Sequence, residues 1–100
     1  MKKLEEIHFH DSEVLSVTIS PDQREVCYLL SYPVDWEHNV YENRTLKFIG
    51  VSQHEVHEGE IVGNPTLLDV KIEKNGDRNK LLFGTTAGKR IIEFTSFTFV

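Results

Sequence analysis

The sequence contains little of what builds a helical, disulfide-linked or membrane-spanning protein. Alanine, the strongest helix former, occurs once in 100 residues, and cysteine occurs once, at Cys27. A single cysteine excludes an intrachain disulfide, which small secreted domains commonly rely on. No apolar run approaches the roughly 20 residues of a membrane-spanning helix, and acidic residues interrupt the start of the chain before a signal peptide could form. We therefore expect a cytoplasmic protein without membrane contact.

Positive charge is also scarce. The chain has 11 lysines and arginines against 16 acidic residues, a formal net charge of -5, and its basic residues are adjacent only at 2–3 and 89–90. Proteins that bind nucleic acids neutralise phosphates with a basic face or stripe. The sequence shows no such stripe, so we expect no nucleic-acid partner.

Residues that favour strands are abundant instead. Valine, isoleucine and threonine together number 24, and their branched side chains pack well on a pleated sheet. Apolar alternation and turn residues predict strands at residues 4–9, 13–20, 24–32, 44–52, 67–74, 81–84 and 89–100. The Asn75-Gly76 pair is the strongest hairpin signal. The sequence predicts a single all-β domain over residues 1–100, an antiparallel meander of six to seven strands that forms a partial barrel or sandwich.

Several positions interrupt this regular pattern. Residues 35–43 and 53–65 are predicted to be loops, each with room for a short helical segment and the second also for a strand. Pro33 should end regular pairing or lie at a sheet edge, and Gly50 should mark a bulge or a close backbone approach. In the last strand the apolar phase slips by one residue, so we expect a bulge near Thr95-Ser96.

Two groups of histidines are the candidate metal ligands. If residues 4–9 form a strand that continues, His8 and His10 point to one face beside Asp11, and His54 and His57 would be neighbours on a helical turn. Together these residues could hold a metal ion, although the spacing matches no strong zinc or iron signature. The alternative is structural, with the histidines at strand ends and in a solvated acidic loop.

The pair His10 and Asp11 also suggests a general base oriented by a carboxylate. No nucleophile or oxyanion motif accompanies the pair, so we expect no enzyme. Asp11 and Ser12 are more typical of a turn, in which their side chains bond nearby backbone amides.

Aromatic residues supply the candidate binding surface. Trp36, Tyr32 and Tyr41 cluster around the predicted loop at 35–43, either as exposed anchors of a protein interface or with Trp36 capping the core. The apolar last strand, if it lies at an open edge, would allow pairing with a second copy. The sequence thus predicts a protein partner or a homodimer formed through the C-terminal strand.

Four segments together resemble a known group of proteins. They are residues 10–15 (HDSEVL), 46–51 (LKFIGV), 67–70 (LLDV) and 83–88 (FGTTAG). Their order resembles that of small bacterial β-rich proteins of unknown function, some of them similar to immunity proteins of polymorphic toxin systems. The resemblance implies a cytoplasmic binding protein that blocks a toxin, and it identifies no catalytic residue.

The functional expectation is accordingly a non-enzymatic protein-binding module, which the resemblance implies to be of the immunity type. The alternative is a metal- or small-ligand-binding domain that uses His8, His10, Asp11, His54 and His57. We expect no cofactor, with a metal ion as the alternative that the histidines leave open.

Overall fold

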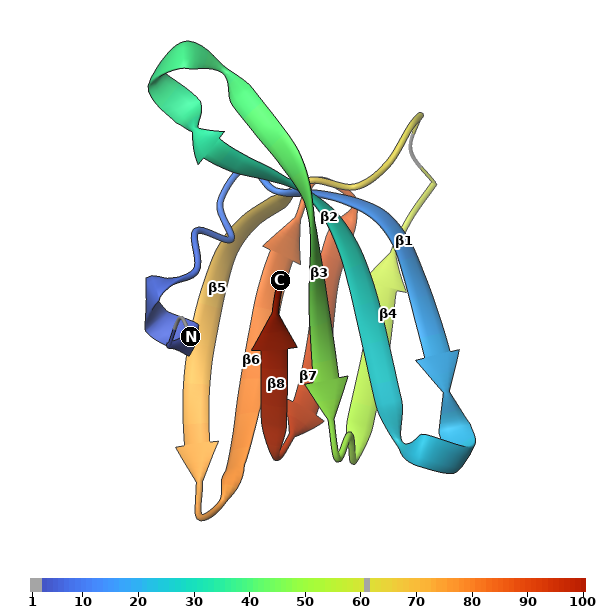
Figure 1. Ribbon diagram of the computed structural model, residues 1–100. Coiled ribbons are helices and arrows are strands. Elements are labelled where there is room, and N and C mark those ends of the chain that lie inside the picture. The colour runs from blue at the N-terminus through green and yellow to red at the C-terminus, as the bar shows by residue number, and fades with distance from the viewer. Residues whose placement is uncertain (1–2, 61) are drawn as a thin grey trace.

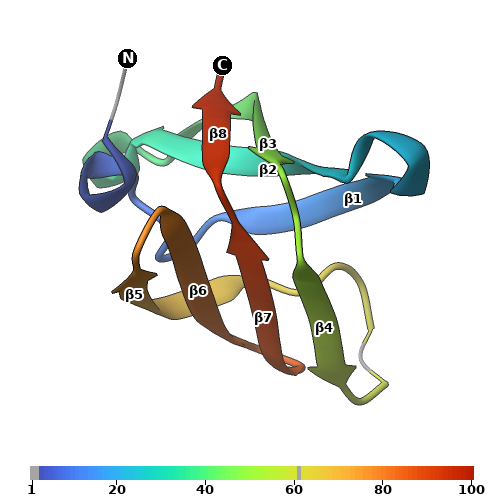
Figure 2. The ribbon, with the colours of Figure 1, turned by 90° about the horizontal axis from the view of Figure 1, so that it is seen from below.

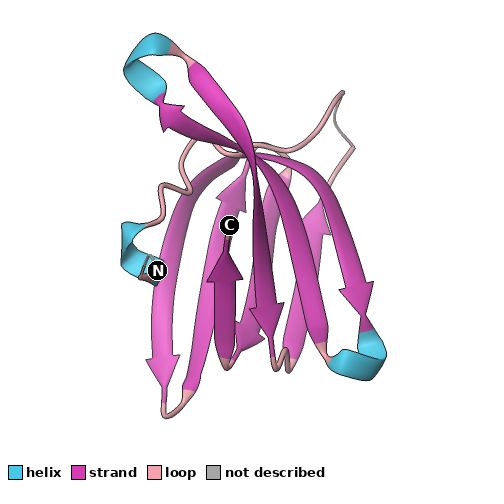
Figure 3. Cartoon of the chain, viewed as in Figure 1, coloured by secondary structure: helices cyan, strands magenta, loops and turns pink. Residues whose placement is uncertain are grey.

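The computed structural model describes residues 3–60 and 62–100, without the side chain of Trp36. Its eight strands form two antiparallel sheets of four strands each, as Figures 1 and 3 show. The prediction of an all-β antiparallel fold is confirmed. The first sheet has the order β1 (Glu13–Ser20), β2 (Glu25–Asp35), β3 (Val40–Ile49) and β8 (Ser96–Phe99). The second has the order β4 (Gln53–Glu58), β7 (Gly88–Phe94), β6 (Arg78–Thr85) and β5 (Leu67–Asn75).

Two chain segments pass directly from one sheet to the other. Figure 2 shows β4 continuing from β3 and β8 continuing from β7. These two crossings, residues 49–53 and 94–96, contact each other. The backbone N–H and the hydroxyl of Thr95 both donate to the Ile49 carbonyl, at 3.0 and 3.1 Å. Gly50 has a φ of +68°, and a Cβ there would lie 2.2 Å from Thr95 Oγ1. The expected close approach at Gly50 is confirmed. The single strand predicted over residues 89–100, with a bulge near Thr95-Ser96, is instead two strands that end and begin at that point and belong to different sheets.

A third connection joins the start of β1 to the start of β5. The Asp11 N–H donates to the Leu67 carbonyl at 2.8 Å, and the Leu67 N–H donates to the Ser12 carbonyl at 2.8 Å. Ser12 is fully buried, and its hydroxyl donates to the His8 carbonyl at 3.0 Å. Asp11 itself has a φ of +69°, a conformation that aspartate tolerates better than most residues. The His10-Asp11-Ser12 stretch therefore forms a corner that ties the two sheets together.

The core lies between the two sheets and is rich in aromatic residues. Phe48 and Phe94 approach from opposite sheets with their ring centroids 4.7 Å apart, and Phe9 meets Phe83 at 5.2 Å. Burying a side chain of this size contributes about 1.5–3 kcal/mol. The core draws on the segment before β1 and on every strand except β4 and β8; of these two, β8 packs partly buried residues against it. The buried core residues are Leu4, Ile7, Phe9, Val14, Val26, Tyr28, Leu30, Tyr32, Leu46, Phe48, Leu67, Leu81, Phe83, Ile92 and Phe94.

Three further segments differ from the prediction. Residues 4–9 are not a strand but a single 3-10 turn, Leu4–Glu6, followed by irregular backbone. Residues 53–58 form the strand β4, the strand alternative for that segment, and β2 and β3 extend into the predicted loop around the 3-10 turn Trp36–His38. A third such turn is Pro21–Gln23, and no helix among the described residues is long and apolar enough to cross a membrane.

Candidate functional site

The hairpin of β2 and β3 extends beyond the neighbouring strands as a projecting arm (Figure 1). β1 accompanies β2 only as far as the pair Glu13–Ser31, and β8 accompanies β3 only from Leu46 to Ile49. From the pair Tyr32–Glu42 to the pair Asp35–Val40, no other strand among the described residues pairs with β2 or β3. Residues 32–43 are called the arm below.

Local sequence explains the shape of the arm. Pro33 has no N–H to donate and lies where β1 has already ended, so the prediction of an edge position is confirmed. The tip turns through Asn39, which has a φ of +56°. His38 Nδ1 lies 2.8 Å from Asp35 Oδ2 across this turn.

The arm exposes apolar side chains. Val34, Val40 and Tyr41 are 40%, 44% and 42% exposed, although apolar residues of this size are usually buried. Tyrosine is also one of the residues that most often anchor protein interfaces. Exposed apolar side chains on a projecting hairpin can be covered by a partner without disturbing the core.

The three aromatic residues predicted for this surface have different positions. Tyr41 is exposed on the arm. Tyr32 is buried at the base of the arm, where its hydroxyl accepts a hydrogen bond from the His8 N–H at 2.9 Å and its ring packs 5.0 Å from that of Phe99. The side chain of Trp36 lies outside the described part of the chain. In this arrangement Tyr32 anchors the arm to the core and does not form part of the exposed surface.

Negative charge is concentrated on the arm and its base. Segments 8–13 and 31–44 contain five acidic residues and one arginine, whereas the rest of the chain contains eleven acidic and ten basic residues. That arginine, Arg44, is already paired with Glu42 at 2.7 Å. Most of the net charge of the protein therefore lies next to the exposed apolar residues.

Two open cavities flank the base of the arm. One, of about 440 Å³, is lined by Asp11, Glu13, Ser31, Tyr41 and Thr66. The other, of about 370 Å³, is lined by His8, His10, Asp11 and Pro33. Asp11 lines both cavities, so the corner that closes the sheets also shapes the surface beside the arm.

The predicted metal ligands are only partly brought together. His8, His10 and Asp11 line one cavity, with His10 Nε2 3.5 Å from Asp11 Oδ1 and the other ring nitrogen of His10 on the Leu68 carbonyl. His54 and His57 lie on strand β4 rather than on a helical turn, so they point to opposite faces. Among residues 3–60 and 62–100, no three histidine, cysteine, aspartate or glutamate side chains are grouped as a metal site requires.

The two histidines of β4 have partners of different kinds. His54 faces inward, with Nε2 2.8 Å from the Tyr28 hydroxyl, and His57 faces outward, with Nε2 2.9 Å from Glu55. Burial lowers the pKa of His54 below its usual value, and the nearby Arg90 lowers it further. His54 is therefore expected to be neutral near pH 7, as a hydrogen-bonding partner of Tyr28.

A charged cluster beside His54 is the polar feature that the sequence did not reveal. Arg90 binds Glu58 through two hydrogen bonds of 2.8 Å, and the Thr85 hydroxyl donates to the same carboxylate at 2.9 Å. The guanidinium also lies over the Tyr28 ring, 5.5 Å from its centroid. These hydrogen bonds hold the pKa of Glu58 low and that of Arg90 high, while burial raises the pKa of Tyr28.

This cluster is structurally satisfied rather than open to a ligand. No buried side-chain nitrogen or oxygen atom in the described part of the chain lacks a hydrogen-bond partner. Residues 58 and 90 are far apart in sequence and meet only because β4 pairs with β7. A cluster that depends on strand pairing leaves no spacing signal in the sequence.

Comparison of the chain with protein-family models and with curated proteins finds no match. The function is therefore proposed from the geometry of the arm and its base.

Proposed function

We propose that this protein is a non-enzymatic binding module whose ligand is another protein, and that the arm is its binding element. The observation that carries the proposal is the exposure of Val34, Val40 and Tyr41 at the end of a hairpin beside which the described part of the chain places no third strand. Interfaces commonly combine a small apolar and aromatic centre with a polar rim. The arm carries both kinds of side chain, because Asp35, Glu37 and Glu42 lie close to its exposed apolar residues in the sequence.

The charge around the arm defines the class of partner. Asp35, Glu37 and Glu42 lie on the arm, and Asp11 and Glu13 line the cavities at its base. Opposite charge across an interface accelerates association and disfavours wrong partners. The partner is thus a protein with an apolar patch bordered by basic residues. The resemblance to immunity proteins supports a toxin as that partner, which the arm would block by covering its surface.

A small-ligand or metal site is the second candidate function. His8, His10 and Asp11 line a common cavity of about 370 Å³, which supports it. His54 and His57 lie elsewhere on β4, so they would contribute nothing to such a site. Because no three such side chains among the described residues are grouped as a metal site requires, a metal ion in this cavity would need additional ligands from outside the protein. Elemental analysis and a thermal melt with and without chelator test it: stoichiometric metal and a melt lowered by chelator would favour this candidate over the binding module.

Capture from lysate of the source cells tests the leading proposal. The immobilised wild-type protein should retain a basic protein that the arm variant V34S/V40S/Y41S does not retain. The matched control V56S/L68S removes exposed apolar side chains from β4 and β5, at 47% and 39% exposure, and should retain the same protein as the wild type. Equal retention by all three baits would contradict the proposal.

A further inference from the structure

The two sheets present four edge strands, and these differ in how they are protected. Natural edge strands avoid pairing with other chains by carrying charges, by being short or by being covered. β5 has charged side chains at four positions, 69, 71, 73 and 74, and β4 has Glu55 and Glu58. β8 has only four residues. In β1 every residue after Glu13 is uncharged.

The first part of β1 is already occupied. A register shift separates Val14 from Ser16, and Glu13 forms an isolated bridge with Thr66, the residue before β5. From Ser16 to Ser20 the strand pairs regularly with β2, and among the described residues no other strand lies on its second edge. This stretch of five residues is called the free edge of β1.

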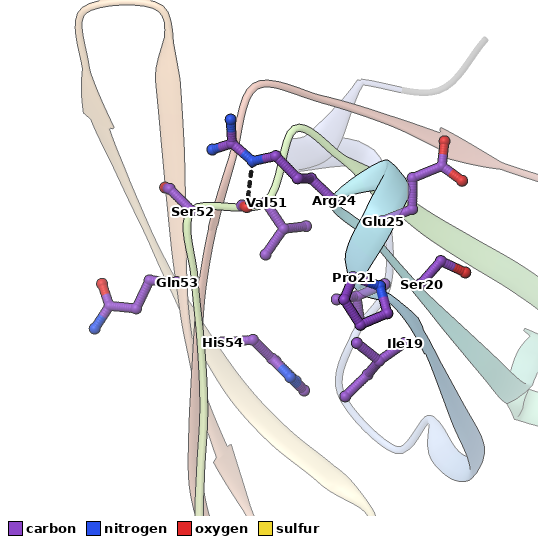
Figure 4. A pocket seen from close by; sticks show the side chains of 10 residues that line it. Ile19, Ser20, Pro21, Arg24, Glu25, Val51, Ser52, Gln53 and His54 are labelled. Atoms are coloured by element: carbon purple, nitrogen blue, oxygen red, sulfur yellow. Dashed lines mark hydrogen bonds between the residues drawn. The ribbon is translucent and has the colours of Figure 1, made fainter.

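The inner face of the free edge has apolar side chains that are incompletely covered. Val17 lies opposite Tyr28 and Ile19 opposite Val26, so both point toward the core side of the sheet. Ile19 nevertheless remains 56% exposed. Figure 4 shows it at the rim of a cavity of about 230 Å³ that His54 of β4 lines from the other side.

We infer that the free edge of β1 pairs antiparallel with the free edge of β1 in a second copy of this chain, with the two-fold axis at Thr18. In this register the two Thr18 residues face each other. Val17 of each copy lies opposite Ile19 of the other copy, and Ser16 of each copy lies opposite Ser20 of the other. Because directly opposed residues share a face, each exposed Ile19 packs on a valine of the partner.

Self-complementarity is the reason for choosing a second copy as the occupant. A two-fold interface brings the same surface patch of both copies together, so a residue on the axis meets its own copy and a patch with charges of one sign repels itself. Residues 16–20 have no charged side chain, and the register opposes only hydroxyl residues to each other and β-branched apolar residues to each other. The same arrangement on β4 would place Glu55 and Glu58 of both copies in one strand pair.

The inferred dimer is compatible with binding through the arm. Figure 1 shows the end of β1 at the opposite end of the molecule from the arm. Pairing through β1 joins the two first sheets into one sheet of eight strands and leaves both arms free. The inference therefore does not depend on the proposed function.

Sedimentation velocity over a range of concentrations tests the inference. Wild-type protein should shift with rising concentration to twice the 11.6 kDa mass of the chain. Thr18 faces outward opposite Cys27, so Thr18→Lys and Thr18→Glu should each stay folded by circular dichroism but sediment as monomers, because like charges meet at the axis. An equal mixture of the two variants should regain the dimer, which misfolded variants could not do.

Ser96→Lys is the matched control, because it adds the same charge to the other uncharged edge, β8. It should leave the wild-type dimer intact. A wild-type chain that stays monomeric at the highest attainable concentration would overturn the inference. A dimer that persists in both Thr18 variants would also overturn it. A dimer that Ser96→Lys dissociates would do the same, because that result would place the contact on the C-terminal strand.

Discussion

The two halves of the β2–β3 hairpin are built from one continuous strand pair but have different surroundings. In the half covered by the second sheet, Tyr28, Leu46 and Phe48 are fully buried. In the arm, Val34 and Val40 are 40% and 44% exposed on the same two strands. The residue types alone do not explain this difference. What differs is whether a second layer covers the strand, so the covered half stabilises the fold and the arm remains available to a partner.

The charges of the molecule show the same contrast. The pair Arg90–Glu58 and the pair Arg44–Glu42 have nearly equal N–O distances, 2.8 and 2.7 Å. The side chains of the first pair are 9% and 11% exposed, and those of the second are 30% and 50% exposed. Water screens the second pair, so only the first should matter for folding.

The largest effect is expected from truncating the covered half. Phe48→Ala removes a fully buried ring that packs against Phe94 and Tyr28. The free energy of unfolding should fall by about 3–5 kcal/mol, measured by urea denaturation. Val40→Ala on the arm end of the same strand should change it by no more than about 0.5 kcal/mol. Similar losses for both variants would remove the distinction between the two halves.

The next effect concerns the buried ion pair. Glu58→Gln keeps the shape of the side chain but leaves the Arg90 guanidinium without its counter-charge, which should cost roughly 3 kcal/mol. Glu42→Gln makes the same chemical change in the exposed pair and should cost roughly 0–1 kcal/mol. Denaturation of both variants beside the wild type measures the difference, and equal costs would mean that burial does not distinguish the pairs.

A smaller loss is expected where the two crossings touch. Gly50→Ala combines a positive φ with a Cβ that would lie 2.2 Å from Thr95 Oγ1, so stability should fall by about 1–3 kcal/mol. Gly59→Ala is the control, because nothing lies within 4 Å of a Cβ at that position. An undisturbed melting temperature in Gly50→Ala would show that the crossing can relax.

The pH dependence should come next in size. His54 has a pKa below its usual value in the folded protein, so the unfolded chain binds the proton more readily. The stabilisation is complete above about pH 6.5, the unfolded value, and declines as pH falls through the folded pKa. Glu58 has a lowered pKa too, but its contribution is lost only at more acidic pH. In the His54→Gln variant, the free energy of unfolding, measured by denaturation between pH 5 and pH 7, should fall less steeply with falling pH than in the wild type. An unchanged pH dependence would assign the decline to another group.

The smallest effect on stability is expected from the arm variant V34S/V40S/Y41S. Its substitutions remove exposed side chains that no third strand covers, so each should change the free energy of unfolding by no more than about 0.5 kcal/mol. Thermal melting measures this. A large loss of stability would mean that the arm is part of the folding core.

Alternation and turn chemistry predicted the sheets because both act locally. The strand over 13–20, the turn at Asn75-Gly76 and the interruption after Phe94 follow from the period of two and from the residues that break it. Residues 4–9 were predicted wrongly, because Ile7 and Phe9 fit an alternating pattern while Leu4 and Ile7 also fit the spacing of one helical turn. Residues 53–58 resembled a polar loop in the sequence, because an edge strand tolerates outward polar side chains such as those of Glu55 and His57.

The candidate site was less predictable because it depends on contacts between distant segments. Tyr41 on the arm could be named from the sequence, but the burial of Tyr32 depends on His8 and Phe99. The concentration of acidic residues at the arm also appears only when segments 8–13 and 31–44 are brought together. The composition determines the net charge of the chain, whereas the strand pairing shows where on the molecule that charge lies.

Amide hydrogen exchange tests the central claim most directly. The protein would be measured alone and in complex with the basic protein that it captures. Binding through the arm predicts new protection over residues 31–44 and 8–13, with no change over β5. Protection gained over β4 or β5, with exchange on the arm unaltered, would contradict the account and place the partner on the second sheet.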